Sequence, residues 1–286
     1  MTIKRLAVMS VFFVVACGGE LSEVPQMPME KEQFPTFTTG PNTEAANDIF
    51  GSVLAKDPIR NLQSQVSSGA RPLIPASGPH FCVRGTDYAT FASPRNPNTN
   101  VTILSIHGGL IELNTSAITL RAAQLFNWDR YDFTAQGTPA CLRGRTNRAI
   151  LHITATHFND PDALNLVTAH PKAVAIHGNR YLVGGRSNMI CIGGRDEAAR
   201  RAFRDKMATI RQQFALSLVD APTTTVFPCD ESKGVDPSNI VNLTTTKKGL
   251  QLEMGESLIA KLAASNSQDT TLATTFYAAL QEAMNR

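Results

Sequence analysis

A histidine and a glutamate, His107 and Glu112, lie five residues apart on either side of a Gly-Gly pair. The apolar, β-branched run at residues 101–106 predicts a buried strand that ends on the histidine. Glycine permits a tight backbone turn, which would bring both side chains toward one point. A catalytic zinc takes three protein ligands from imidazole and carboxylate groups and keeps a fourth position for water. This stretch therefore supplies two of the three ligands of a candidate zinc site.

Two further histidines, His152 and His177, each end an apolar run that the sequence predicts to be a strand. Ligands of open α/β sheets bind beyond the carboxyl ends of the strands, so we expect both histidines to converge there with His107. We predict His152 as the third metal ligand. His157, in the loop that directly follows the same run, remains the alternative.

A carboxylate that could act as a general base lies on a later predicted strand, residues 249–254. Side chains alternate between the two faces of a strand, so Leu250 and Leu252 face one way and Gln251 and Glu253 the other. A positioned carboxylate can accept a proton from water and pass it to a leaving amine. We therefore predict Glu253 as the catalytic base.

Predicted strands and helices alternate along the chain, which is typical of an α/β fold with a mostly parallel central sheet. The predicted strands are residues 101–106, 130–134, 149–154, 172–178, 189–194, 239–242 and 249–254. The predicted helices are residues 116–126, 196–216, 256–264 and 272–284, with another beginning at Asp160-Pro161. The length suits one large domain.

The composition is that of a globular chain, with 42% hydrophobic and 18% charged residues among 286. The formal net charge is +3, and two of the basic residues, Lys4 and Arg5, lie at the N-terminus. The remaining excess is too small to indicate nucleic-acid binding by bulk charge, and we expect no such partner.

The N-terminus has the pattern of a bacterial lipoprotein signal. The apolar stretch at residues 6–15 is too short to span a bilayer, and Ala16-Cys17 after it resembles a lipobox. We predict a signal peptide at residues 1–16, a flexible tether at 17–47 and a catalytic domain at 48–286. The protein would be exported and anchored to a bacterial membrane by a lipid on Cys17, at the outer membrane in a Gram-negative cell.

Four cysteines follow the leader: Cys82, Cys141, Cys191 and Cys229. Their spacing is not that of metal ligands, and an exported protein with an even number of cysteines forms disulfides. Four cysteines allow three pairings, and the sequence leaves the choice open.

Several motifs follow one another between residues 87 and 253. They are Ser-Ile-His107-Gly-Gly-Leu-Ile-Glu112, Leu-His152-Ile-Thr-Ala-Thr-His157-Phe-Asn-Asp-Pro161, Ala-Ile-His177-Gly178, Ile-Gly193-Gly194 and the stretch from Asn239 to Glu253. This series resembles the poly-γ-glutamate hydrolase family of bacteriophages and bacteria. The resemblance implies one domain similar in fold to zinc carboxypeptidases, with helices on both faces of the sheet and a single zinc ion. It also implies hydrolysis of γ-glutamyl amide bonds, with His107, Glu112 and His152 as ligands and Glu253 as the base.

The substrate that this resemblance implies, poly-γ-glutamate, is a polyanion. Its binding requires cationic side chains near the metal. Arginines lie on the loops expected at the active edge of the sheet. We predict that Arg143, Arg145 and Arg180, together with His177, bind the substrate.

Three positions depart from the family's pattern: Asn114 where glycine is usual, Asn159 in place of aspartate and Leu243 in place of arginine. Asparagine can adopt the left-handed conformation that glycine would supply, so we expect the turn at Asn114 to be kept. The other two departures bear on the choice of substrate. Two alternatives stay open: a zinc peptidase that acts on cell-wall peptides, and a surface lipoprotein that binds a polyanion without catalysis.

Overall fold

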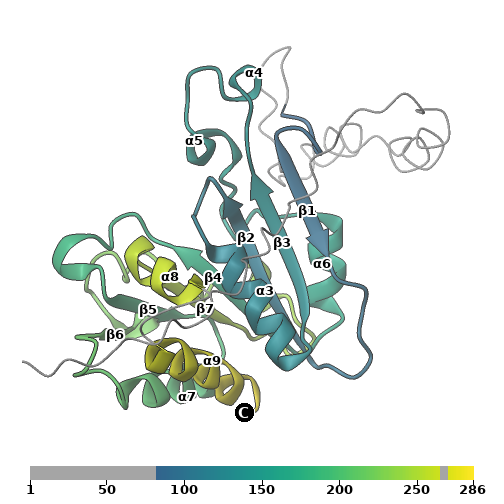
Figure 1. Cartoon of the computed structure of the whole chain (residues 1–286). Helices are drawn as coiled ribbons and strands as arrows, with labels where there is room; N and C mark the ends of the chain where they lie inside the picture. Colours follow the sequence, from purple (N-terminus) through teal and green to yellow (C-terminus); the bar gives the residue numbers. More distant parts are fainter. Residues whose placement is uncertain (1–81, 265–269) are drawn as a thin grey trace, which may run out of the picture. The chain divides into compact units, whose positions relative to one another are not determined.

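The strands form one sheet in the part of the chain that the computed structural model describes, residues 82–264 and 270–286 (Figure 1). The predicted signal peptide, the lipidation site Cys17 and the tether lie outside these residues. The strands are β1 (Tyr88–Ala92), β2 (Val101–Gly109), β3 (Asp129–Ala135), β4 (Lys172–Gly178), β5 (Met189–Gly193), β6 (Ser217–Asp220) and β7 (Leu250–Met254). Their order across the sheet is β1-β3-β2-β4-β7-β5-β6.

Most neighbouring strands run parallel, and only β1 with β3 and β5 with β7 are antiparallel. The predicted mixed, mostly parallel sheet is therefore confirmed. Parallel neighbours place their carboxyl ends at one edge of the sheet. The ends of β2, β4 and β7 meet there, which are the strands that carry His107, His177 and Glu253.

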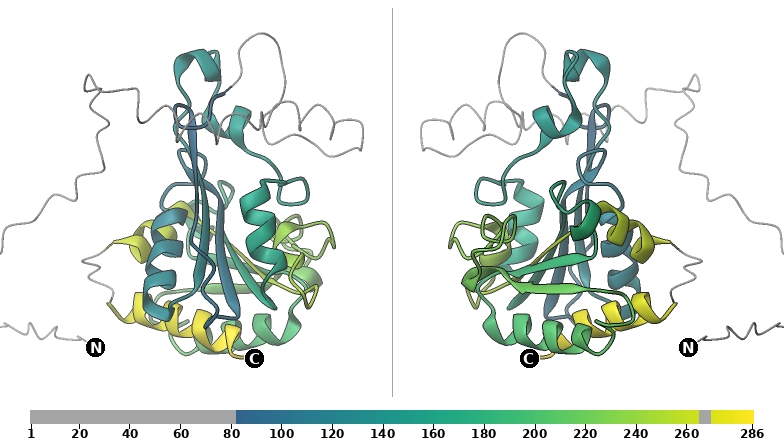
Figure 2. Two further views of the ribbon diagram at one scale, coloured as in Figure 1. Left: turned by 90° about the vertical axis from the view of Figure 1, so that its right-hand side faces the viewer. Right: turned by 90° about the vertical axis from the view of Figure 1, so that its left-hand side faces the viewer.

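Helices cover both faces of the sheet, as predicted (Figure 2). One face is covered by α3 (Thr115–Phe126), α7 (Glu197–Ala208), α8 (Glu256–Ala263) and α9 (Thr270–Met284). The other is covered by α6 (Pro161–Thr168) with the short helices α5 (Asn147–Leu151) and η3 (Ile240–Asn242), while the short α4 (Pro139–Leu142) precedes α5. No helix among the described residues is both long and apolar enough to cross a membrane.

Each face of the sheet has its own buried core because the side chains of a strand alternate. On one face Ile103 and Leu252 pack in a cluster with Phe203 of α7 and Phe276 of α9. On the other, Leu104 belongs to a second cluster that contains residues of α5, α6 and η3. This double cover explains why the strands read as continuous apolar runs in the sequence.

The run at residues 149–154 is not a strand, which corrects the prediction. Asn147–Leu151 forms helix α5, which Thr146 starts by accepting a hydrogen bond from the Ala149 N–H, and His152 is the C-cap. Both sides of β2 are already paired, with β3 and β4, so the sheet has no place for another strand beside it. Periodicity does not distinguish a short buried strand from a short buried helix.

Two smaller predictions were also wrong, and one strand was missed. Residues 239–242 include the 3₁₀ helix η3 and no strand. Helix α7 ends at Ala208, well before residue 216, and β6 follows it as a strand that the sequence did not indicate. The predicted helix at Asp160-Pro161 is confirmed: the Asp160 carboxylate accepts hydrogen bonds from the N–H groups of Asp162 and Ala163.

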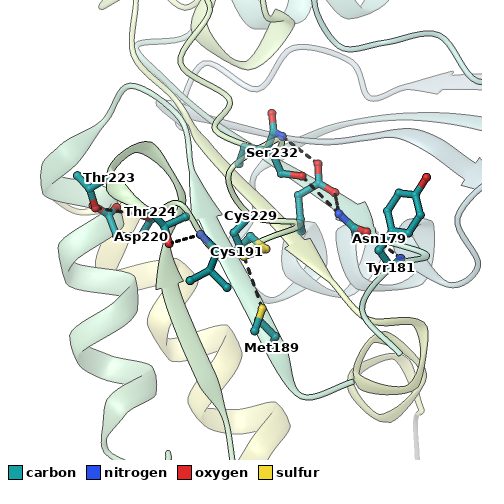
Figure 3. The surroundings of a disulfide bond; sticks show 12 residues. Asn179, Tyr181, Met189, Cys191, Asp220, Thr223, Thr224, Cys229 and Ser232 are labelled. Carbon is teal, nitrogen blue, oxygen red and sulfur yellow. Dashed lines mark hydrogen bonds between the residues drawn. A yellow bond between two sulfur atoms is a disulfide. The ribbon is translucent and has the colours of Figure 1, made fainter. Parts of the chain in front are cut away.

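The structure pairs Cys82 with Cys141 and Cys191 with Cys229. The first disulfide joins the segment before β1 to helix α4. The second joins β5 to the loop between β6 and η3, as Figure 3 shows. Cys191 lies opposite Glu253 in the register of β5 and β7, so this loop is attached beside the predicted base.

Candidate active site

A tight turn after β2 brings Glu112 back toward His107. Gly109 adopts φ 66°, and a side chain there would collide with the backbone of Ala135 on β3. The Glu112 N–H donates to the carbonyl of His107 at 2.8 Å, which closes the turn. Asn114 has φ 66°, as predicted from its tolerance of the left-handed region, and it forms the N-cap of α3.

His107, Glu112 and His152 bring their ligand atoms together. One atom from each lies within 4.8 Å of the others, an arrangement that could hold a metal ion. His107 Nδ1 is 3.0 Å from Glu112 Oε1, and His152 Nε2 is 3.8 Å from the same oxygen. The two imidazole rings stack with their centroids 4.0 Å apart.

The two histidines of this group each have a lone pair available. His107 Nε2 lies 2.7 Å from the carbonyl of Ile153, which only accepts hydrogen bonds, so we infer that Nε2 carries the proton. In the neutral ring Nδ1 is then free to bind a cation, and the carbonyl fixes the ring's orientation. Burial and the neighbouring His107 lower the pKa of His152 to about 3, so that ring is neutral at physiological pH.

Glu112 is buried among donors. The Gly178 N–H donates to Oε2 at 2.9 Å, and Arg148 Nη2 lies 3.4 Å from Oε1. Burial raises the pKa of Glu112. In the metal-free site, protonated rings of His107 and His177 outweigh burial through their charges and hydrogen bonds, and they hold this pKa below its usual range. The carboxylate is therefore ionised, which is the state that a metal ligand requires.

His177 lies directly behind this group. Its Nδ1 is 3.1 Å from His107 Nδ1 and 3.5 Å from Glu112 Oε2. Burial lowers the pKa of His177, but the hydrogen bond to Glu112 and the negative charges of Glu253 and Glu112 together outweigh burial and raise this pKa overall. The residue is 2% exposed, and its Nε2 has no hydrogen-bond partner among the described residues. His177 therefore contacts Glu112 through Nδ1 alone.

Glu253 is held by side-chain amides. Gln251 Nε2 donates to Oε1 at 3.0 Å, and Asn179 Nδ2 donates to Oε2 at 3.4 Å. Asn239 Nδ2 in turn donates to Gln251 Oε1 at 2.8 Å, which fixes the orientation of that amide. Burial raises the pKa of Glu253, with a smaller opposing effect from His177. A buried carboxylate with a raised pKa is suited to accept and release a proton.

These side chains line one cavity of about 490 Å³, which contains His107, Glu112, His152, His177 and Glu253 in its wall. Another part of the cavity wall is formed by Pro228 and residues 230–236, next to the Cys191–Cys229 disulfide. In Figure 3, Asn179 and Ser232 lie close together beside this disulfide, and the two side chains are joined by a 3.3 Å hydrogen bond. This hydrogen bond connects the loop at residues 228–236 to Asn179, which also donates to Glu253.

The sequence over residues 83–282 matches the family model for poly-γ-glutamate hydrolase. The chain belongs to this family. A bacteriophage poly-γ-glutamate hydrolase is similar with a TM-score of 0.55 and 25% identity, covering 70% of this chain and 89% of that one. The zinc-free form of YndL gives a TM-score of 0.53 and 23% identity, covering 70% of this chain and 90% of that one.

Protein YndL of Bacillus subtilis strain 168 is also a curated relative, with 29% identity over 154 residues. That match covers 54% of this chain and 52% of YndL. The chain spans about half the length of the curated relatives it matches. The family and the fold of the poly-γ-glutamate hydrolases, which the motifs predicted, are thus confirmed.

In this member of the poly-γ-glutamate hydrolase family, His157 is not part of the ligand group. It is exposed, and its Nδ1 lies 2.8 Å from Thr154 Oγ1. Of the two alternatives for the third ligand, His152 is therefore the one that the fold brings to His107 and Glu112. Leu243, where the family pattern has arginine, is half-buried against the core and does not line the cavity.

Two of the predicted substrate-binding arginines are not at the cavity. Arg143 and Arg145 lie on the exposed connection between α4 and α5 and do not line the cavity, because the chain turns outward there before α5 begins. Arg180 does line it and stacks over Tyr181, with 4.8 Å between guanidinium carbon and ring centroid.

Arg148 lines the cavity. The sequence places it among the arginines expected at the active edge of the sheet, but we did not include it among the predicted substrate-binding residues. It lies four residues before His152, on helix α5 and not on the predicted strand. Asn179 was missed as well, because a single amide after a strand has no motif of its own.

Proposed function

We propose that this protein is a zinc-dependent hydrolase that cleaves γ-glutamyl amide bonds. The observation that carries the proposal is the convergence of His107, Glu112 and His152 beside the buried carboxylate Glu253, in one cavity. The family points to γ-glutamyl bonds, and the relative YndL, whose structure is that of a zinc-free form, points to zinc as the metal.

The donor set fits zinc. Two neutral imidazoles and one ionised carboxylate are a usual ligand set of catalytic zinc sites. His107 Nδ1 and Glu112 Oε1 are both lone-pair atoms in the neutral-imidazole state, yet they lie 3.0 Å apart. A cation between them would relieve this contact, so His107, Glu112 and His152 are the residues we assign to hold zinc.

The chain's own residues account for the proton transfer. Zinc, when bound, polarises the scissile carbonyl and lowers the pKa of water to about 7. Glu253 accepts a proton from the attacking water on a carboxylate oxygen and delivers it to the leaving nitrogen. The amides of Gln251 and Asn179 keep that carboxylate oriented. The Arg148 guanidinium, at the edge of the ligand group, stabilises the negative charge that develops on the carbonyl oxygen.

Metal removal tests the proposed function. The purified protein is incubated with poly-γ-glutamate and with a γ-glutamyl-norleucine peptide, whose norleucine side chain is uncharged, and released amino groups are measured. We expect cleavage that a chelator abolishes and added zinc restores, with no cleavage of α-linked polyglutamate. Failure of the zinc-loaded protein to cleave either γ-linked substrate would reject the proposal, as would cleavage that persists after the chelator has removed all metal.

Replacing Arg148 by alanine is expected to lower kcat by about a hundredfold to a thousandfold, because it removes a donor from the developing oxyanion. KM should change much less. Arg148→Lys should recover part of kcat, since lysine keeps the charge without the planar fork. Arg201→Ala, on the exposed face of α7, is the matched control. An Arg148→Ala enzyme with raised KM and unchanged kcat would show that this residue only binds substrate.

A further inference from the structure

Besides the assigned metal ligands and the base Glu253, charged side chains of both signs line the cavity. Setting aside Glu112 and Glu253, the cations are Arg148, Arg180 and Lys233, and the anions are Asp230, Glu231 and Asp236. Positive and negative side chains are thus equal in number. A cavity that bound a polyanion would have an excess of cations.

The carboxylates lie on a wall that the fold holds in place. Asp230 directly follows Cys229, whose disulfide partner Cys191 is on β5, and the Asp230 N–H donates to the carbonyl of Val226 at 3.1 Å. Further along the wall, the Lys233 carbonyl accepts a hydrogen bond of 2.9 Å from the N–H of Gly194 at the end of β5. The backbone at Asp230 is therefore held in place relative to the sheet edge.

These carboxylates are not neutralised within the described part of the chain. Asp230, Glu231 and Asp236 form no ion pair with any residue in it. Asp230 Oδ1 is shielded from solvent and has no hydrogen-bond partner among these residues. A carboxylate oxygen without a hydrogen-bond donor is unfavourable in the folded protein. A cationic or N–H group of a bound ligand would stabilise the Asp230 carboxylate.

The charge of the substrate group beside Asp230 distinguishes two classes of substrate, polyanionic peptides and peptides that carry an ammonium group. A run of γ-linked glutamates would bring one carboxylate per residue toward the partly buried Asp230 and the exposed Glu231 and Asp236, and like charges repel. An ammonium group would instead meet Asp230 directly. The cation Arg180 would remain for the carboxylate of the γ-linked glutamate itself.

We infer that the preferred substrate is a zwitterionic peptide, in which a residue joined to the γ-linked glutamate carries a free ammonium group that Asp230 binds. Asp230 is then a specificity-determining residue within the cavity. This inference rests on the proposed hydrolysis of γ-glutamyl amides. The inferred substrate differs from the family's polyanionic substrate in the charge of the residue next to the γ-linked glutamate.

The test compares γ-glutamyl peptides that carry lysine, norleucine or glutamate next to the γ-linked glutamate, in one series on the amine side and in another on the acyl side. We expect kcat/KM for lysine to exceed that for norleucine by about tenfold in one of the series, as a close charge pair in a partly buried site would produce. Glutamate should be the poorest of the three. Asp230→Asn should bring the lysine-to-norleucine ratio close to one, whereas Asp205→Asn, on exposed α7, should leave it unchanged.

The ratio is taken within one variant, so a loss of folded protein lowers both rates equally. Cleavage of all three peptides with equal rates, or with glutamate preferred, would overturn the inference and leave the proposed function intact. A lysine preference that survives Asp230→Asn would overturn the assignment to Asp230. Absence of cleavage of any γ-glutamyl peptide would reject the proposed function, and this inference with it.

Discussion

Replacing Glu253 by glutamine is expected to lower kcat by about a thousandfold, the size of effect that general acid–base catalysis contributes. Glutamine keeps the shape of the side chain and can still bond to the amides of Gln251 and Asn179, but it cannot accept a proton. Because Glu253 is not among the assigned ligands, the variant should bind as much zinc as the unchanged protein. Steady-state kinetics and metal analysis on the same preparation measure both quantities.

Glu282→Gln is the matched control for this prediction, since Glu282 is exposed on α9 and pairs only with Arg286 among the described residues. It should leave kcat unchanged. A Glu253→Gln protein that retains more than about a tenth of kcat would show that another group transfers the proton. If that protein instead loses its zinc, Glu253 belongs to the metal site and not to the proton transfer.

Replacing Glu112 by glutamine is expected to abolish turnover by removing zinc. Glu112 is the carboxylate of the ligand group, and a neutral amide offers no charge to the cation. Loss of even an outer partner of a metal ligand weakens metal binding by about 10–100-fold, so loss of the ligand itself should exceed that. Competition with a chelating dye measures the affinity, and thermal unfolding of the metal-free proteins checks that the variant folds.

The same experiment separates two roles for Glu112. His177 and Arg148 both approach its carboxylate, so a purely structural glutamate would destabilise the fold when replaced but leave zinc affinity unchanged. His157→Ala serves as the control, because this exposed histidine was the rival ligand. Unaltered zinc affinity in Glu112→Gln, or a large loss in His157→Ala, would contradict the assigned ligand set.

Much of the site could be predicted from local sequence because its parts follow strands directly. His107 and Glu112 are separated only by a glycine turn, and Glu253 lies on a strand whose other face is apolar. The parallel arrangement then brings the ends of β2, β4 and β7 together. Asn114 could also be anticipated, since few residues other than glycine adopt its positive φ.

The errors arose where tertiary pairing, and not local pattern, decides the structure. The apolar run around His152 is compatible with strand or helix, and the occupied edges of β2 exclude the strand. Arg148 could be expected near the active edge, but its position on helix α5 could not. The wall at residues 228–236 has no periodicity, and its place beside Glu253 depends on the Cys191–Cys229 disulfide. The sequence alone does not determine which pairs of the four cysteines form disulfides.

The most direct measurement of the central claim is anomalous X-ray diffraction at the zinc absorption edge from crystals of the zinc-loaded protein. The account predicts one strong peak, within roughly 2.0–2.2 Å of His107 Nδ1, an oxygen of Glu112 and a ring nitrogen of His152. A peak bound by His157, or no peak beside His107 and Glu112 in protein that has been saturated with zinc, would contradict it.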